Sequence, residues 1–118
     1  WRLTGLLRKD SLEMTDADRR LVRDAVEACP EKRIIITHGT DTMTSTAQTL
    51  SGIAGKTIVL FGAMQPARMR RSDAVFNLGF AVAAVGLLPP GVYVAMNGDV
   101  FEAGKVRKNL KAGRFERE

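Results

Sequence analysis

The fold of this chain is decided by one segment, Ile34-Ile35-Ile36-Thr37-His38-Gly39-Thr40-Asp41-Thr42-Met43. It begins with an apolar, β-branched run, which favours a buried strand. It then changes to small, hydroxyl-bearing residues around a glycine, and a helical pattern begins at Met43. A turn of this kind, at the carboxyl end of a strand, is where parallel α/β sheets carry their functional groups. Here the turn has a hydroxyl beside a carboxylate, at Thr40 and Asp41.

Strand and helix patterns alternate on both sides of this segment. Short apolar runs predict strands at 33–37, 57–61 and 92–96, and a weaker one at 3–7 that a glycine interrupts. Apolar residues at helical spacing predict helices at 16–29, 43–54 and 75–87. The last of these is apolar almost all round, so we expect it to be the most buried.

The ends of these elements have their own signals. Thr15 begins a capping-box pattern before the first helix, and Pro30 ends that helix. Gly55 is expected to stop the second helix. The third helix is expected to be capped by Ser72 or Asp73.

The order of elements predicts an α/β fold with three layers, in which helices flank a parallel sheet of Rossmann or flavodoxin type. Asn97-Gly98 predicts a tight turn into a returning strand at 100–101, and thus a terminal β-hairpin. A length of 118 residues corresponds to a single domain over residues 1–118. Because Trp1 is not preceded by a methionine, we expect this domain to be incomplete at its N-terminus.

The composition is that of an ordinary globular domain, with 45% hydrophobic and 26% charged residues. No apolar run is long enough to cross a bilayer and no signal-peptide pattern is present, so no membrane partner is expected. The single cysteine, Cys29, allows no internal disulfide and favours a cytoplasmic location. With one histidine, His38, and no phosphate-binding glycine motif, neither a metal site nor a cofactor is expected.

The net charge is +5, from 18 basic and 13 acidic residues. Much of the excess falls near the C-terminus, at Lys105, Arg107, Lys108, Lys111, Arg114 and Arg117. Such a segment could contact nucleic acid, but it lacks the interleaved aromatic pattern that serves base stacking. We therefore favour a solvated, partly frayed terminus and expect no nucleic-acid partner.

Thr40 and Asp41 are the first candidates for chemistry. A threonine hydroxyl becomes a nucleophile only when a nearby base takes its proton, and backbone N–H groups at a helix start can hold the oxyanion of the reaction. The local alternative is that one of the two side chains merely caps the helix, and the short motif alone favours that alternative. Asp10 and Ser11 follow an earlier expected strand, so they could reach the same edge of the sheet as Thr40.

The identity of the base stays open at this point. Lys105, Lys108 or Lys111 follows the predicted hairpin and could supply an amine, although a solvated lysine is the ordinary case. His38 is explained more simply by local hydrogen bonds than as a base.

Four ordered pieces of the sequence carry a more specific indication. Residues 36–43 resemble the second signature of the bacterial-type L-asparaginase/glutaminase family. Residues 10–14 look like the family's substrate loop, and residues 59–66, with Phe76-Asn77-Leu78 after them, are similar to the strand, loop and helix that follow the signature. Residues 95–108 look like the segment that carries the family's catalytic lysine. The likeness covers nearly the whole chain and reverses the preference for a simple helix cap.

The resemblance implies an amidohydrolase that converts the side-chain amide of asparagine, or a related amide, to the acid and ammonia through an acyl-enzyme. By resemblance, Lys108 accepts the proton of the nucleophile Thr40, and Asp41 orients this pair and holds the substrate's α-amino group. Ser11 matches the residue that binds the α-carboxylate, and the substrate-binding positions also include Gly39, Thr40, Asp41 and Ala63. The implied partners are a small-molecule amide and further copies of the chain, as a dimer or tetramer.

The sequence also departs from the family pattern. The family's earlier T-G-G-T-I-type signature, the tyrosine that follows it and the smaller C-terminal domain do not occur in residues 1–118, so the chain looks like an N-terminal-domain form truncated at its start, and its activity as a fragment stays open. Leu12 stands where a polar residue usually contacts the substrate. These departures motivate an alternative of another class, a non-catalytic amino-acid-binding or assembly domain derived from the same fold.

Overall fold

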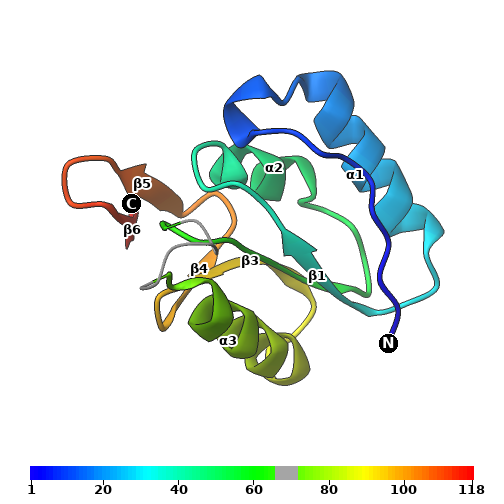
Figure 1. The fold of residues 1–118 in the computed structure, drawn as a ribbon. Coiled ribbons are helices and arrows are strands. Elements are labelled where there is room, and N and C mark those ends of the chain that lie inside the picture. The colour runs from blue at the N-terminus through cyan, green and yellow to red at the C-terminus, as the bar shows by residue number, and fades with distance from the viewer. Residues whose placement is uncertain (66–71) are drawn as a thin grey trace.

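In the computed structural model, which describes residues 1–65 and 72–118, one main sheet has helices on both faces (Figure 1). After ten residues without regular structure, the described part of the chain forms a 3-10 helix, η1, then three α-helices and six strands. Their bounds are η1 (Ser11–Glu13), α1 (Asp16–Ala28), β1 (Arg33–Thr37), α2 (Met43–Thr49), β2 (Thr57–Phe61), α3 (Ala74–Leu87), β3 (Gly91–Met96), β4 (Asp99–Glu102), β5 (Val106–Asn109) and β6 (Arg114–Arg117). Pro66, part of the expected loop after β2, lies outside the described residues.

The main sheet has the strand order β1-β2-β3-β4. The strands β1, β2 and β3 are parallel, whereas β4 runs antiparallel to β3, so the sheet is mixed. The turn between β3 and β4 consists of Asn97 and Gly98, with φ values of 50° and 84°. Two positive φ values are what the expected two-residue hairpin turn requires. The predicted α/β fold with a terminal hairpin is confirmed.

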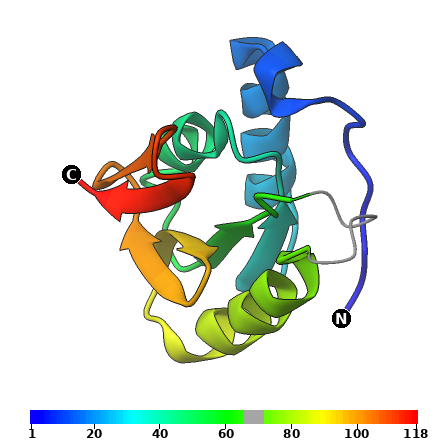
Figure 2. The same cartoon turned by 60° about the vertical axis from the view of Figure 1, so that its left-hand side comes forward.

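Alternate side chains of the central strands pack on opposite faces of the sheet, because successive residues of a strand point to opposite sides. Ile58 and Leu60 of β2 belong to a core shared with α1 and α2, while Val59 and Phe61 belong to a core shared with α3. All five residues of β2 are buried. Both views show α3 on one face of the sheet and α1 with α2 on the other (Figures 1 and 2).

The strand expected at residues 3–7 is wrong. The segment before η1 is irregular, and it passes the β1 side of the sheet without pairing with it (Figure 2). Leu3 is 90% exposed and Leu6 is 42% exposed. In the described part of the chain β1 pairs with β2 alone, so residues 3–7 have no neighbouring strand to accept and donate their backbone hydrogen bonds.

Two helices differ from the prediction. The second helix ends at Thr49 rather than near residue 54, because the chain turns at Gly52, which has a φ of 88°. The third helix is not the most buried element. It is the one described helix on its face of the sheet, and it therefore buries a single stripe (Asn77, Ala81, Ala84, Val85).

The C-terminal segment is ordered, which corrects the expectation of a frayed terminus. It forms a second antiparallel hairpin, β5–β6, that the sequence patterns did not predict. Val106 and Phe115 anchor it in the core on the α2 side. Several of its basic side chains pair with carboxylates, at Arg107–Glu116, Arg114–Glu116 and Arg117–Asp99.

Among the described residues, no helix combines the length and apolar character that a membrane crossing needs.

Candidate active site

The turn between β1 and α2 forms the centre of the candidate site. The backbone N–H of His38 donates to the carbonyl of Phe61 at 2.9 Å, which extends the pairing with β2 one residue beyond the strand. The N-cap of α2 is Thr42, and its side chain makes no cap hydrogen bond. The helix therefore does not use Thr40 or Asp41 as its cap residue, which contradicts the simple capping interpretation.

Lys108 reaches this turn from the β5–β6 hairpin. Its Nζ lies 2.8 Å from Thr40 Oγ1 and 2.6 Å from Asp41 Oδ1. Val106 is buried against the core, and Lys108 lies two residues further along β5 on the same face of the strand. This register directs the Lys108 side chain toward the turn.

The geometry also distinguishes Lys108 from the other two candidate lysines. The side chain of Lys108 is 15% exposed, whereas that of Lys105 is 75% exposed and pairs with Glu102 on the hairpin surface. Lys111 is exposed at the tip of the β5–β6 hairpin. Sequence spacing could not select among the three, because the selection depends on how the hairpin packs against α2.

Ser11 packs against the same turn from the N-terminal side. Its Oγ accepts a hydrogen bond from the Asp41 backbone N–H at 3.2 Å, and its carbonyl accepts one from Thr42 Oγ1 at 2.7 Å. Ser11 is 1% exposed, so its hydroxyl is part of the buried base of the site. The expectation that Ser11 approaches Thr40 through the fold agrees with this position.

Gly39 is a close-contact position between the turn and Ser11. A Cβ built on Gly39 would lie 2.8 Å from Ser11 Cβ and 2.9 Å from Ser11 Oγ. Real Cβ atoms are not found at such distances, so a glycine is required for this packing. Gly39 thus contributes to the site by its missing side chain.

Ala63 lies on the loop that follows β2 and is half-buried. Its methyl side chain forms no hydrogen bonds, so it can take part in binding only through its backbone or by packing. The loop itself is held by Asp73, whose carboxylate accepts hydrogen bonds from the backbone N–H groups of Met64 and Gln65, each at 3.0 Å. Ala63 therefore occupies the same edge of the sheet as Thr40 but belongs to a separately anchored loop.

The Asp73 network is one that sequence reasoning missed. Besides the loop, Asp73 Oδ2 accepts from the side chains of Asn77 and Asn97, both at 2.9 Å. Burial by itself raises the pKa of Asp73, but the hydrogen bonds from Asn97, Gln65 and Met64 outweigh it and hold that pKa below its usual value of 3.8. The spacing of Asp73 and Asn77 by four residues on one helix face was the available signal.

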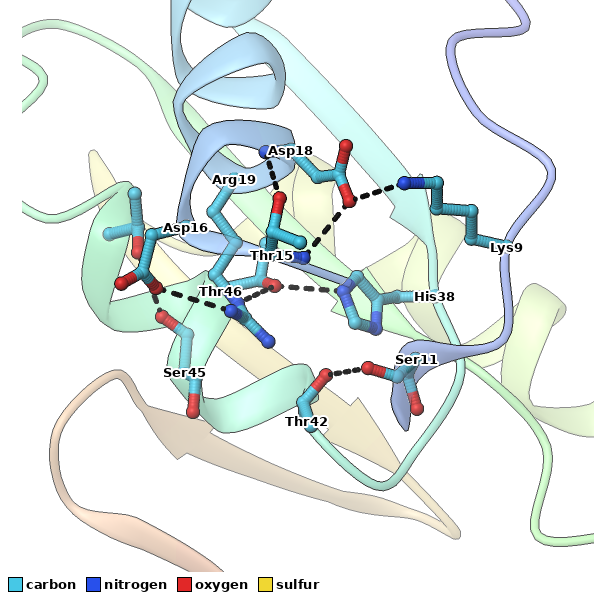
Figure 3. A network of polar contacts seen from close by, with 11 residues as sticks. Lys9, Ser11, Thr15, Asp16, Asp18, Arg19, His38, Thr42, Ser45 and Thr46 are labelled. Carbon is cyan, nitrogen blue, oxygen red and sulfur yellow. Dashed lines mark hydrogen bonds and ion pairs between the residues drawn. The ribbon is translucent and has the colours of Figure 1, made fainter. Parts of the chain in front are cut away.

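A second missed network lies beneath the turn, on the α1 side (Figure 3). His38 Nε2 lies 2.8 Å from Thr46 Oγ1, and Arg19 Nε donates to the same oxygen at 3.2 Å. His38 Nδ1 lies 2.6 Å from the Gly39 carbonyl oxygen. The expectation that His38 satisfies local hydrogen bonds is confirmed. Arg19 lies on α1 and Thr46 on α2, and the packing of these two helices brings the side chains together. A local sequence pattern does not indicate such a contact.

The side chains of Asp41 and Lys108 also border a surface hollow of about 310 Å³, together with residues of α2 and β5. Another hollow, of about 440 Å³, borders Tyr93 and Val100, and its lining includes none of Ser11, Thr40, Asp41 and Lys108. Within residues 1–65 and 72–118, no three His, Cys, Asp or Glu side chains gather in a way that could hold a metal ion. The chemistry available at the site is that of a hydroxyl, an amine and a carboxylate.

The fold and these three groups define a class: α/β domains with a threonine–lysine–carboxylate cluster at the carboxyl ends of the parallel strands of a mixed sheet. The family model described as "Asparaginase, N-terminal" matches residues 2–115, and the chain belongs to this asparaginase family.

Individual relatives agree with the family match. The chain is 36% identical to a glutaminase-asparaginase of Acinetobacter glutaminasificans, over 92% of this chain and 36% of that protein. It is 34% identical to a glutaminase-asparaginase of Pseudomonas fluorescens biotype A, over 82% of this chain and 29% of that protein. The crystal structure of L-asparaginase I from Vibrio cholerae superimposes with a TM-score of 0.81 at 32% identity, covering 92% of this chain and 35% of that chain. The chain thus spans about a third of the length of such relatives.

Proposed function

We propose that the protein is an amidohydrolase of the asparaginase type, which hydrolyses the side-chain amide of asparagine or a related amide to the acid and ammonia. The observation that carries the proposal is the 2.8 Å separation of Lys108 Nζ and Thr40 Oγ1. An amine at this distance is within reach of a hydroxyl proton, which is the requirement for a general base that activates a nucleophile. The relatives named above bear the activity in their names.

The proposed reaction has two stages. In its amine form Lys108 takes the proton of Thr40, and the threonine oxygen bonds to the amide carbon of the substrate. The carbon–nitrogen bond then breaks, Lys108 returns the proton to the leaving nitrogen, and ammonia departs. Water next adds to the ester carbon, the bond to the threonine oxygen breaks, and the proton lost by water restores the Thr40 hydroxyl. The sum is amide plus water to acid plus ammonia.

Asp41 has two roles in this proposal. Its Oδ1 lies 2.6 Å from Lys108 Nζ, so it orients the lysine toward Thr40. The Asp41 side chain is 36% exposed, which leaves part of the carboxylate open to a cationic group. A substrate α-ammonium is such a group, and a charge-assisted hydrogen bond to it would fix the substrate's orientation. Ser11 and Ala63 are the proposed neighbours of the substrate's remaining polar groups.

The second candidate function is a non-catalytic amino-acid-binding or assembly domain with the same anchors. Leu12 favours it, because this apolar side chain is 72% exposed beside Ser11, where a substrate-contacting site would use a polar group. In this case Asp41 would still hold an amino acid, and Thr40 would not react. The two candidates differ in turnover: the amidohydrolase forms a covalent intermediate on Thr40 and releases ammonia, and the binding domain does neither.

The deciding experiment is a rapid acid quench of the protein with asparagine or glutamine, followed by peptide mass analysis. If the protein is an amidohydrolase, we expect an ester that adds the mass of the substrate minus ammonia to the Thr40 peptide. The Thr40→Val variant should carry no such adduct. The binding domain predicts calorimetric binding of the amino acid with no adduct and no ammonia. An adduct that persists in Thr40→Val contradicts the assignment of the nucleophile.

A further inference from the structure

We propose that His38 is a positioning residue of this site: held by Thr46 and Arg19 as the tautomer protonated on Nδ1, it fixes the Gly39 carbonyl and thereby the Thr40–Asp41 turn. This inference deepens the proposed function and rests on it for the catalytic consequence alone. The geometry stands independently of any turnover.

The hydrogen bonds specify the tautomer. The Gly39 carbonyl oxygen can only accept, so His38 Nδ1, at 2.6 Å, carries the proton that it receives. Thr46 Oγ1 accepts from Arg19 Nε, because a guanidinium can only donate. Its single hydroxyl proton is then available for His38 Nε2 at 2.8 Å, which acts as the acceptor in the neutral ring. The three bonds form a chain in which every donor points toward Gly39.

The Gly39 carbonyl belongs to the peptide unit that also carries the Thr40 backbone nitrogen. A hydrogen bond from a buried imidazole therefore restrains the rotation of this peptide unit, and with it the direction of the Thr40 side chain. Hydrogen bonds in a chain also polarise one another, so the Arg19 guanidinium strengthens the bonds from Thr46 to His38 and from His38 to Gly39. Ser11 restrains the other side of the turn through the Asp41 N–H.

The surroundings of the ring leave it little freedom. His38 is 9% exposed and Thr46 is fully buried. Gly62, next to the ring's own backbone, has no room for a side chain, because a Cβ there would contact the His38 carbonyl oxygen. Burial lowers the pKa of His38, the Gly39 bond opposes that change, and the Arg19 charge adds to the lowering. The neutral ring that the hydrogen-bond chain requires is thus the form that the surroundings favour.

The test is nitrogen-15 NMR of the protein, in which His38 is the single histidine and its ring signals need no assignment. At neutral pH we expect a pyridine-type shift at Nε2 and a protonated Nδ1. A protonated Nε2 in the neutral ring, or rapid averaging between tautomers, overturns the proposal. This readout needs no activity, so it separates a failure of the positioning role from a failure of the proposed function.

Variants of Thr46 then test the consequence for the turn. Thr46→Val removes the hydroxyl at nearly constant volume, and Thr46→Ser retains it as the matched control. We expect Thr46→Val to shift the Gly39 carbonyl carbon and Thr40 amide signals, and to lower kcat about ten- to a hundredfold with little change in KM. Thr46→Ser should keep the wild-type signals and rate. Unchanged Gly39 and Thr40 signals in a folded Thr46→Val protein overturn the proposal.

Discussion

Lys108 Nζ lies 2.8 Å from Thr40 Oγ1, although 68 positions separate the two residues in the chain. The contact forms because a buried valine anchors the β5–β6 hairpin beside α2, and the lysine follows it on the same strand face. Both partners are shielded, since Thr40 is 9% exposed and the Lys108 side chain 15% exposed. The proposed chemistry depends on this shielded hydroxyl–amine pair and on the carboxylate beside it.

Asp41→Asn tests the role of the carboxylate. We expect a large rise in KM and a fall in kcat, because the amide no longer attracts either Lys108 or a substrate ammonium. Stability should change by less than about 1 kcal/mol, since the Asp41 side chain is 36% exposed and solvent screens the pair. Steady-state kinetics and urea unfolding measure the two effects.

The control for that variant is Asp99→Asn, which removes an ion pair between β4 and β6 with Arg117 that is more exposed than the Lys108–Asp41 pair. It should leave KM and kcat unchanged. A wild-type KM in Asp41→Asn is the result that speaks against Asp41 as the substrate anchor.

Gly39→Ala tests the packing beneath the turn. The added Cβ would lie 2.8 Å from Ser11 Cβ, so we expect the Ser11 turn to be displaced and the protein to lose about 1–3 kcal/mol of stability. Gly79→Ala is the control: nothing lies within 4 Å of its Cβ position in α3, and alanine should stabilise that helix by about 0.5–1 kcal/mol. In urea unfolding we expect a lower free energy of unfolding for Gly39→Ala and a higher one for Gly79→Ala than for the wild type. A Gly39→Ala protein as stable as the wild type contradicts the close contact.

Asp73→Asn tests the anchoring of the loop that carries Ala63. The carboxylate accepts from two backbone N–H groups, so its replacement should cost about 1–3 kcal/mol and expose those amides to exchange. Hydrogen exchange at Met64 and Gln65 reports the local effect. Asp24→Asn, an exposed position on α1, is the control and should leave both amides protected. If the Met64 and Gln65 amides stay as protected from exchange in Asp73→Asn as in the wild type, the carboxylate does not anchor this loop.

His38 gives the protein a pH-dependent stability. Burial lowers the pKa of its imidazole below the ordinary value of 6.5, so the unfolded chain takes up a proton at a higher pH than the folded protein. The contribution of His38 to stability is therefore complete above pH 6.5 and decreases as the pH falls from 6.5 through the folded-state pKa. The slope for one proton cannot exceed about 1.4 kcal/mol per pH unit.

Urea unfolding from about pH 7.5 to about pH 5.5 measures this slope, because histidine is the side chain that ordinarily titrates there. His38→Asn keeps a donor near the Nδ1 position and has no titrating group, so its stability should vary less with pH than that of the wild type. Parallel pH profiles of the two proteins contradict the prediction.

Local patterns were sufficient for the elements that pack by their own periodicity. The strand 33–37 and the capping box at Thr15 were predicted because β-branched apolar residues and a reciprocal cap are local signals, and the structure contains both. Residues 3–7 have a similar apolar pattern but no neighbouring strand, and a strand depends on its neighbour. The exposed outer face of α3 could not be predicted either, because its apolar sequence is compatible with burial on every side.

The candidate site was predictable in part. The Thr40–Asp41 turn follows from the strand-to-helix transition. Ser11 was expected at the same edge because it follows the predicted strand 3–7, but that segment forms no strand, so its position beside the turn was reached on a wrong premise. The selection of Lys108 came from a family resemblance, since the spacing of three nearby lysines carries no information about which one faces inward. The Arg19–Thr46–His38 chain was missed because its members come from three separate elements.

The most direct test of the central claim is ammonia release from asparagine and glutamine by the wild type, Lys108→Met and Lys105→Met, each shown to be folded by circular dichroism. If Lys108 is the base for Thr40, Lys108→Met should be slower than the wild type by about 100- to 10,000-fold, the usual loss when a general base is removed. Lys105→Met, which changes an exposed lysine three positions away, should retain the wild-type rate. A Lys108→Met protein with the wild-type rate would contradict the account.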